Sequence, residues 1–251
     1  MSGAEDIKPY DLHEEKGAQV EQMFDSIAPA YDFMNNAMTF GLHRYWRNRA
    51  LAMLAGELRG KRRLRMLDVA CGTGDVTFHL RRLFGDQTQI EGIDLSSGML
   101  AIARKRLASM PEADRRAITF VEGDCLALPY ESSSYDAVTV AYGVRNFADL
   151  RAGYAEMRRV LKPGGILCVI ELCEPRGAFM RAGYRFYSRR IIPLVGRAVS
   201  GDKSAYTYLP QSIAACPQRE SMTALMEEAG LCQAGYVTLF PGAIAIYMAR
   251  K

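Results

Sequence analysis

The stretch Leu67-Asp68-Val69-Ala70-Cys71-Gly72-Thr73-Gly74-Asp75 decides the fold of this 251-residue chain. An apolar strand ends there at Asp68, a turn with two glycines follows, and a helix begins near Asp75. Gly72 and Gly74 allow the backbone to turn sharply and to approach a ligand closely. A strand, a glycine turn and a helix in this order predict the cofactor-binding unit of an α/β sheet, although several cofactor classes use such a turn.

Further strand candidates follow this turn and alternate with helical stripes. Most are continuous apolar runs, as expected for strands that are covered on both faces. We predict strands at residues 64–70, 89–94, 117–122, 136–141, 166–172, 234–240 and 243–249. Only Pro241-Gly242 joins the last two, which is too short for a crossover, so these two strands must be antiparallel. The prediction is a Rossmann-like α/β fold with a seven-stranded, mostly parallel sheet whose last two strands are antiparallel.

The whole chain is expected to form one domain, because its length fits one large sheet with an elaborated end. Helical patterns precede the first strand, one of them at about 44–58, and the strand–helix repeat breaks after Leu172. We expect four parts within residues 1–251: an N-terminal helical lid (1–60), a cofactor-binding core (61–172), a substrate-side insertion (173–218), and a C-terminal helix with the antiparallel strands (219–251).

Composition narrows the classes of partner. The net charge of +4 comes without a dense basic stripe, so no nucleic-acid partner is expected. The six cysteines form no CxxC pair and the three histidines are too few for a zinc set, so we expect no metal and reduced thiols in a cytoplasmic protein. No stretch is long enough to span a bilayer as a helix. A membrane role would therefore be peripheral, at the inner face of the cytoplasmic membrane.

Acidic residues at the next two strand ends indicate a nucleoside ligand. Asp94 follows Gly74 by 20 residues (94 − 74), the separation expected of an acid that accepts from ribose hydroxyls. Asp124 ends the third strand and is placed to accept from an adenine amino group, with the backbone of Cys125 at the ring. Ala141 ends the fourth strand beside the same crevice. The alternative for each single Asp is a turn or cap residue, but together with the glycine turn they favour a cofactor site.

The two ends of the glycine turn distinguish between cofactors. Asp75 opens the helix, where it disfavours the pyrophosphate that a nicotinamide dinucleotide would place there. Asp68 precedes the turn and is placed to reach an ammonium group, directly or through water. S-adenosylmethionine has an ammonium group and no phosphate, so it fits better than a nicotinamide cofactor. A nicotinamide-dependent oxidoreductase stays the alternative from another class.

From about residue 18 to its end, the chain resembles the UbiE/MenG/Coq5 family: demethylmenaquinone methyltransferase and 2-methoxy-6-polyprenyl-1,4-benzoquinol methylase. The glycine turn is generic to methyltransferases, whereas the other shared motifs are far more specific. The matching stretches are Val20 to Asp32, Gly41-Leu42-His43-Arg44-Tyr45-Trp46-Arg47, Leu67 to Asp75, Tyr142-Gly143-Val144-Arg145-Asn146-Phe147, and Tyr206 to Ser212 with its Tyr208-Leu209-Pro210 centre. Ala141 departs from the family, since many members have a serine there.

This resemblance implies a class I S-adenosylmethionine-dependent methyltransferase that releases S-adenosylhomocysteine. It implies that the methyl group goes to a ring carbon of a polyprenyl quinol. The step would be demethylmenaquinol to menaquinol, or the equivalent benzoquinol step of ubiquinone biosynthesis. A methyltransferase of another small hydrophobic acceptor is the alternative. With the turn itself, the cofactor positions would be Asp68, Gly72, Thr73, Gly74, Asp94, Asp124, Cys125 and Ala141.

Four residues are candidates for the chemistry. Arg145 and Asn146 follow the fourth strand, where a fixed cation would stabilise a developing phenolate; a surface ion pair is the alternative for Arg145. Tyr31 would close over the substrate from the lid, or simply pack at a helix end. His43 has a suitable pKa for proton transfer, or is a packed, hydrogen-bonded residue.

The insertion interleaves arginines and aromatic residues over residues 178–199. This pattern fits a segment that lies on a membrane surface or lines an entrance for the prenyl tail, and equally a solvated helix. The number of copies in the working enzyme, including a homo-oligomer, stays open at this stage.

Overall fold

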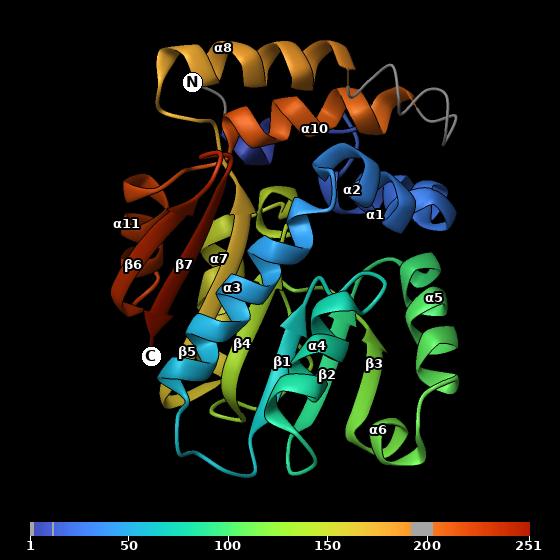
Figure 1. Cartoon of the computed structure of the whole chain (residues 1–251), viewed down its shortest axis with the longest axis vertical. Coiled ribbons are helices and arrows are strands. Elements are labelled where there is room, and N and C mark those ends of the chain that lie inside the picture. Colours follow the sequence, from blue (N-terminus) through green and yellow to red (C-terminus); the bar gives the residue numbers. More distant parts are fainter. Residues whose placement is uncertain (1–2, 12, 192–202) are drawn as a thin grey trace.

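The computed structural model describes residues 3–11, 13–191 and 203–251. Seven strands form one sheet in the order β3-β2-β1-β4-β5-β7-β6 (Figure 1). The strands are β1 (Arg65–Val69), β2 (Gln89–Asp94), β3 (Ile118–Glu122), β4 (Tyr135–Ala141), β5 (Leu161–Leu172), β6 (Cys232–Leu239) and β7 (Ile244–Arg250). All seven predicted strands are present, and the predicted α/β fold with a mostly parallel sheet is confirmed.

The antiparallel pairing at the end of the sheet is also confirmed, with one refinement. β7 pairs antiparallel with both β5 and β6, so β7 alone runs against the other strands. β7 lies inside the sheet and β6 at its edge. Residues 244–246 of β7 are accordingly fully buried, whereas much of β6 is exposed. The more apolar of the two strands therefore occupies the inner position.

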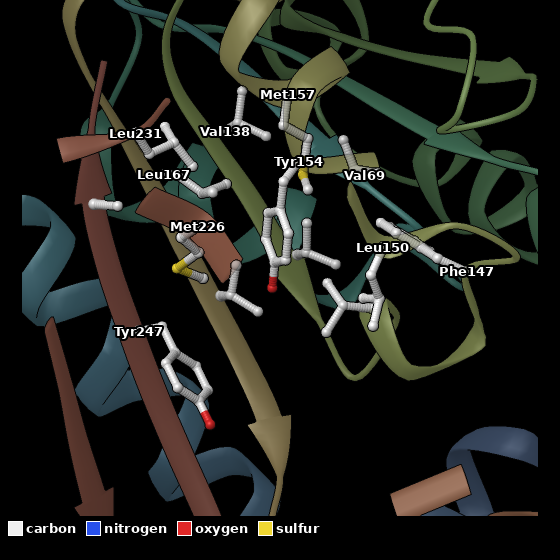
Figure 2. Packing of buried hydrophobic residues seen from close by; sticks show 14 of the residues in the cluster. Val69, Val138, Phe147, Leu150, Tyr154, Met157, Leu167, Met226, Leu231 and Tyr247 are labelled. Atoms are coloured by element: carbon white, nitrogen blue, oxygen red, sulfur yellow. The ribbon is translucent and has the colours of Figure 1, made fainter. Parts of the chain in front are cut away.

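Helices cover both faces of the sheet. On one face, α7 (Leu150–Val160) and α11 (Glu220–Glu228) pack against β1, β4, β5 and β7, with Tyr154 and Met226 among the contacts (Figure 2). On the other face, α3 (Leu42–Glu57) and α4 (Asp75–Phe84) pack through Trp46, Leu54 and Leu80. α5 (Ser97–Ala108) and the short α6 (Glu112–Ala117) lie next to β3. Because a strand turns alternate residues to opposite faces, each inner strand has to be apolar along its whole length.

The remaining elements gather over the carboxyl ends of the parallel strands (Figure 1). They are η1 (Ala4–Asp6), α1 (Lys16–Ile27), η2 (Ala28–Ala30), α2 (Tyr31–Thr39), η3 (Val144–Asn146), α8 (Ala178–Phe186), the π-helical η4 (Tyr187–Ile191) and α10 (Lys203–Ala215). α2 lies between α1 and α3, before the first strand. Within the described residues, each helix is too short or too polar to span a bilayer.

Candidate active site

Two cavities lie at the carboxyl ends of the strands. The smaller has a volume of about 460 Å³ and is lined by both predicted nucleoside carboxylates, Asp94 and Asp124. The larger has a volume of about 1120 Å³ and is lined mostly by apolar and aromatic residues of α1, α2, α3, α8 and α10. Seven residues line both cavities, which therefore meet: Phe24, Tyr31, Ala70, Gly72, Ala141, Tyr142 and Asn146.

The glycine turn needs its glycines for two different reasons. Gly74 has φ +84°, and a Cβ there would lie 2.8 Å from the ring of Phe78 and 2.9 Å from that of Phe120. Gly72 has φ +54° but no neighbouring atom within 4 Å, so its requirement is conformational and leaves open space beside the backbone. Ala70 and Tyr142 also have positive φ values, of 52° and 60°. Such strain in residues with side chains is typical of ligand sites, and both residues line the junction of the cavities.

Asp94 connects the glycine turn to the next strand. Its carboxylate accepts hydrogen bonds from the backbone N–H groups of Gly72, at 2.7 Å, and Ser96, at 2.9 Å. Burial raises the pKa of Asp94, although these N–H groups act in the opposite direction. Asp124 is exposed and accepts from the backbone N–H of Leu126 at 2.8 Å. The structure therefore brings Gly72, Asp94, Asp124 and the half-buried Cys125 to one cavity, and their contacts with a cofactor stay a prediction.

Asp68 lies deeper than the other acids. Its carboxylate oxygens accept hydrogen bonds from the Thr77 hydroxyl at 2.6 Å and from the Thr139 hydroxyl at 2.7 Å. Burial raises the pKa of Asp68 to about 6. These bonds join the end of β1 to α4 and β4, so Asp68 positions the turn. Its predicted contact with an ammonium group stays a prediction.

Asp75 and Thr73 connect the turn to the N-terminal helices. Asp75 forms ion pairs with Arg47 of α3 at 2.6 Å and with Arg106 of α5 at 2.7 Å. Burial alone would raise the pKa of Asp75, but the two guanidinium groups outweigh it and lower that pKa. The Thr73 hydroxyl donates to Asp32 of α2 at 2.8 Å. The carboxylate at the start of α4 is thus charged, which is unfavourable for a phosphate at this position.

Asp25 is a contact that sequence reasoning missed. This residue of α1 accepts hydrogen bonds from the Ser96 hydroxyl, at 2.5 Å, and from the Gly98 backbone N–H, at 2.9 Å. Asp25 therefore caps the first turn of α5 from another helix. A Cβ on Gly98 would lie 2.9 Å from the Asp25 carboxylate. The sequence signal for this contact was Gly98, a glycine directly after the Ser96-Ser97 cap, which leaves room for a group from another element.

Arg145 is buried and borders the larger cavity. Its Nη1 donates to Glu171 Oε1 at 2.9 Å and also to the Tyr142 carbonyl. Burial would lower its pKa, but the charge of Glu171 outweighs this effect and raises it. Its Nε is buried and has no partner among the described residues. Arg145 therefore forms a buried ion pair beside the cavity rather than a surface pair, and Glu171, which lies inside an apolar strand, was not among the predicted residues.

The other predicted catalytic residues surround the same space. Asn146 accepts a hydrogen bond from the Tyr208 hydroxyl of α10 at 3.2 Å and lines both cavities. Tyr31 lies at their junction, and burial raises its pKa. His43 lines the larger cavity, and its Nδ1 lies 2.7 Å from the Thr39 hydroxyl. Burial and then Arg47 lower the pKa of His43.

Lys16 is a second residue that sequence reasoning missed. Its buried Nζ donates to three carbonyls, those of Ala4 at 2.7 Å, Arg145 at 3.1 Å and Phe147 at 3.0 Å. Burial lowers its pKa to about 8. Lys16, which lines the smaller cavity, thus holds the segment that contains Arg145 against the start of α1. A lone lysine at a helix start carries no sequence signal for this role. Among the described residues, no group of three His, Cys, Asp or Glu side chains is placed to hold a metal ion.

Solved structures share this architecture. The phosphoethanolamine N-methyltransferase 2 of Haemonchus contortus, in complex with S-adenosyl-L-methionine, superposes with a TM-score of 0.60 at 17% identity, covering 81% of this chain and 52% of that one. A SAM-dependent methyltransferase of Thermotoga maritima gives a TM-score of 0.59 at 20% identity, covering 92% and 99%. At such identities the likeness concerns the fold.

Sequence relatives are considerably closer. A demethylmenaquinone methyltransferase of Porphyromonas gingivalis is 42% identical over 251 residues and 100% of both chains. A ubiquinone/menaquinone biosynthesis C-methyltransferase UbiE of Geobacter sulfurreducens is 38% identical over 237 residues, 94% of this chain and 90% of the relative. The ubiE/COQ5 methyltransferase family matches residues 11–251. This chain therefore belongs to the ubiE/COQ5 methyltransferase family and is an S-adenosylmethionine-dependent methyltransferase.

Proposed function

We propose that this enzyme transfers a methyl group from S-adenosylmethionine to a ring carbon of demethylmenaquinol, which yields menaquinol. The observation that carries the proposal is the junction of the two cavities. The smaller one offers carboxylates for a nucleoside, and the larger one offers about 1120 Å³ of mostly apolar space, which is large for a ligand pocket. A polar cofactor and a large apolar acceptor would meet at Tyr31, Gly72 and Ala141.

The residues of the smaller cavity fit S-adenosylmethionine. Asp94 and Asp124 offer acceptors for ribose hydroxyls and an adenine amino group, and the open space beside Gly72 admits a close ligand. The charged Asp75 at the start of α4 opposes a dinucleotide pyrophosphate. When bound, the cofactor supplies a methyl group on a positively charged sulfonium.

Arg145 supplies the fixed positive charge of the acceptor site. A quinol ring carbon becomes nucleophilic when a phenolic proton leaves, because the negative charge spreads into the ring. Glu171 holds Nη1 of Arg145 at 2.9 Å, which fixes the guanidinium group beside the larger cavity. A preorganised donor of this kind stabilises a developing oxyanion, and one such donor is typically worth about 10²–10³ in rate. An arginine is too basic to remove the proton itself.

His43 is the proton acceptor that we infer. The Thr39 hydroxyl donates its single proton to the Asn35 carbonyl at 2.6 Å. The Thr39 oxygen can therefore only accept from His43 Nδ1, which leaves Nε2 of a neutral ring with a free lone pair. The lowered pKa keeps His43 neutral at pH 7. The proton would reach Nε2 directly or through a bound water.

The family relatives favour menaquinone over ubiquinone biosynthesis, since the first relatives are named demethylmenaquinone methyltransferases. The benzoquinol step is the second candidate, because other relatives are named for both pathways. We place the enzyme at the inner face of the cytoplasmic membrane as a peripheral protein, because a polyprenyl acceptor resides in the bilayer.

One experiment tests the proposal. The protein is incubated with methyl-labelled S-adenosylmethionine and a panel of chemically reduced quinols, and the products are identified by mass spectrometry. A labelled menaquinol from demethylmenaquinol supports the proposal, and labelling of the benzoquinol alone would replace it with the second candidate. Thermal stabilisation by NADH but not by S-adenosylhomocysteine, with no labelled product, would overturn both.

A further inference from the structure

We propose that the enzyme docks on an anionic lipid bilayer through the mouth surface, defined as Phe40, Phe179, Arg181 and Phe186. This inference rests on the proposed function, because it identifies the face through which a membrane-resident acceptor would enter. Nothing in the sequence pattern distinguished a docking helix from a solvated one, and the side-chain exposures make that distinction.

The larger cavity opens at exposed aromatic side chains. Phe40 and Phe179 both line this cavity, yet they are 82% and 89% exposed. Phe186 is 64% exposed. The next residue, Tyr187, has its ring centroid 6.4 Å from that of Phe40. Scattered exposed apolar residues are normal, but several large rings around the opening of an apolar cavity mark an interaction site.

α8 is apolar on two sides. Met180, Tyr184 and the following Tyr187 turn toward the larger cavity. Phe179 and Phe186 are seven residues apart and so share one side of the helix, which meets the cavity only at Phe179, and no residue of α8 is buried. A helix that is only solvated would not expose two large aromatic rings in addition to its exposed Arg181 and Arg185. α8 is also the outermost element over the carboxyl ends of the strands (Figure 1).

Phe40 is exposed by an unfavourable backbone conformation. It follows the last turn of α2 with φ +50°, a left-handed position where helices usually place glycine or asparagine. A bulky residue with positive φ is strained, and such strain is typical of functional positions. Here the conformation holds a large ring in the solvent beside the cavity opening.

The charge of the insertion favours anionic lipid over an apolar protein surface. Residues 173–218 contain seven arginines and lysines and two acidic residues, a net charge of +5, whereas the whole chain has +4. The rest of the chain therefore sums to −1. Arg176 and Arg185 pair with Glu220 and Glu174, but Arg181 has no ion pair within the described residues. Basic residues beside exposed aromatic rings are the usual composition of a helix that lies on an anionic membrane.

Vesicle binding tests the docking surface. The full-length protein is mixed with vesicles of phosphatidylcholine alone or with an equal share of phosphatidylglycerol, and the bound fraction is measured by sedimentation. Wild type should bind the anionic vesicles. Arg181→Glu should weaken binding about tenfold, because it replaces an attracted charge by a repelled one, and Phe186→Ser should weaken binding to a similar extent. Arg62→Glu and Val237→Ser are the controls, since these exposed residues lie outside the mouth surface.

Activity measurements separate this inference from the proposed function. Arg181→Glu and Phe186→Ser should keep wild-type turnover on a quinol with a single isoprene unit in solution, and should lose about tenfold on a polyprenyl quinol in anionic vesicles. No methylation of either quinol by wild type would overturn the proposed function. Two results would overturn the docking surface. In the first, the variants bind the anionic vesicles as well as wild type does. In the second, wild type binds no vesicles and is a dimer in solution, which Phe186→Ser converts to a monomer.

Discussion

Arg145 and Glu171 form a buried ion pair, with Arg145 Nη1 2.9 Å from Glu171 Oε1 and both side chains almost fully inaccessible. One charge belongs to the loop after β4 and the other to β5, so the sheet itself fixes their separation. Two charges removed from water this way usually do not add net stability. Arg145 borders the larger cavity, and in the proposed function it supplies the fixed positive charge of the acceptor site.

Arg145→Lys should therefore affect catalysis more than cofactor binding. An ammonium group keeps the charge but lacks the planar fork of N–H donors that lets the guanidinium pair with Glu171 and still donate to a substrate oxygen, so turnover should fall by about 10²–10³. The affinity for S-adenosylhomocysteine, measured by calorimetry, should change less than threefold. Arg81→Lys is the matched control, because Arg81 is equally buried and paired with Asp114 outside both cavities. Full activity of Arg145→Lys would contradict the assigned role.

Asp94→Asn should weaken cofactor binding. The carboxylate accepts from two backbone N–H groups, and an amide would turn one of these contacts into a clash of two donors. Loss of hydrogen bonds to a charged group typically costs about 1.5–3 kcal/mol. We expect the Kd for S-adenosylhomocysteine to rise by roughly 10- to 100-fold. Asp86→Asn, an exposed aspartate paired with Arg81, should leave that Kd unchanged; equal effects in the two variants would refute the site.

Gly74→Ala should destabilise the protein by about 1–3 kcal/mol through strain and crowding together. Its positive φ opposes any side chain, and the new Cβ would meet Phe78 and Phe120 below 3 Å. Gly60→Ala separates the two effects, since Gly60 has φ +82° but open space around it. Thermal unfolding of both variants should show the larger loss for Gly74→Ala. Equal losses would mean that the aromatic rings simply move aside.

Asp68 should make the stability depend on pH. Its pKa is raised from 3.8 to about 6 in the folded protein, so the folded state binds more protons than the unfolded state between these values. The contribution of Asp68 is favourable below pH 3.8 and is lost as the pH rises through 6. At 1.36 kcal/mol per pH unit the change is about 3 kcal/mol. The free energy of unfolding of wild type and of Asp68→Asn is measured by denaturant titration from pH 4 to 7. Over this range wild type should lose about 3 kcal/mol of stability relative to the variant. A pH-independent difference would contradict the raised pKa.

His43→Gln should remove the acidic limb of the activity profile. The unprotonated ring is the active form, and because burial lowers its pKa, wild-type kcat/KM should stay high below pH 6.5 and fall only at lower pH. A positioned base typically contributes about 10²–10⁴-fold, so the variant should lose at least 10²-fold near neutrality. An unchanged acidic limb in His43→Gln would assign the proton to another group.

Much of the core follows from local sequence. Continuous apolar runs marked the strands within two residues at most ends, and β5 begins earlier because its first residues pair with β4 across an irregular register. The glycine turn, Asp94 and Asp124 also followed from spacing, since the ends of parallel strands meet at one edge of a sheet. The identity of the strand beside β5 did not follow, because a tight hairpin fixes the relative direction of β6 and β7 but not which of them is inserted.

The sequence by itself determined the α/β sheet, the cofactor turn and the family, since each depends on residues close together in the chain. Tertiary structure alone decided the contacts between distant segments. Asp25 reaches α5 across 71 positions to Ser96, and Lys16 binds the carbonyl of Arg145 across 129. Such contacts leave no periodic pattern, because they depend on how helices pack over the sheet. The physical reason is that a motif encodes local backbone geometry, whereas a cavity exists only where separate elements meet.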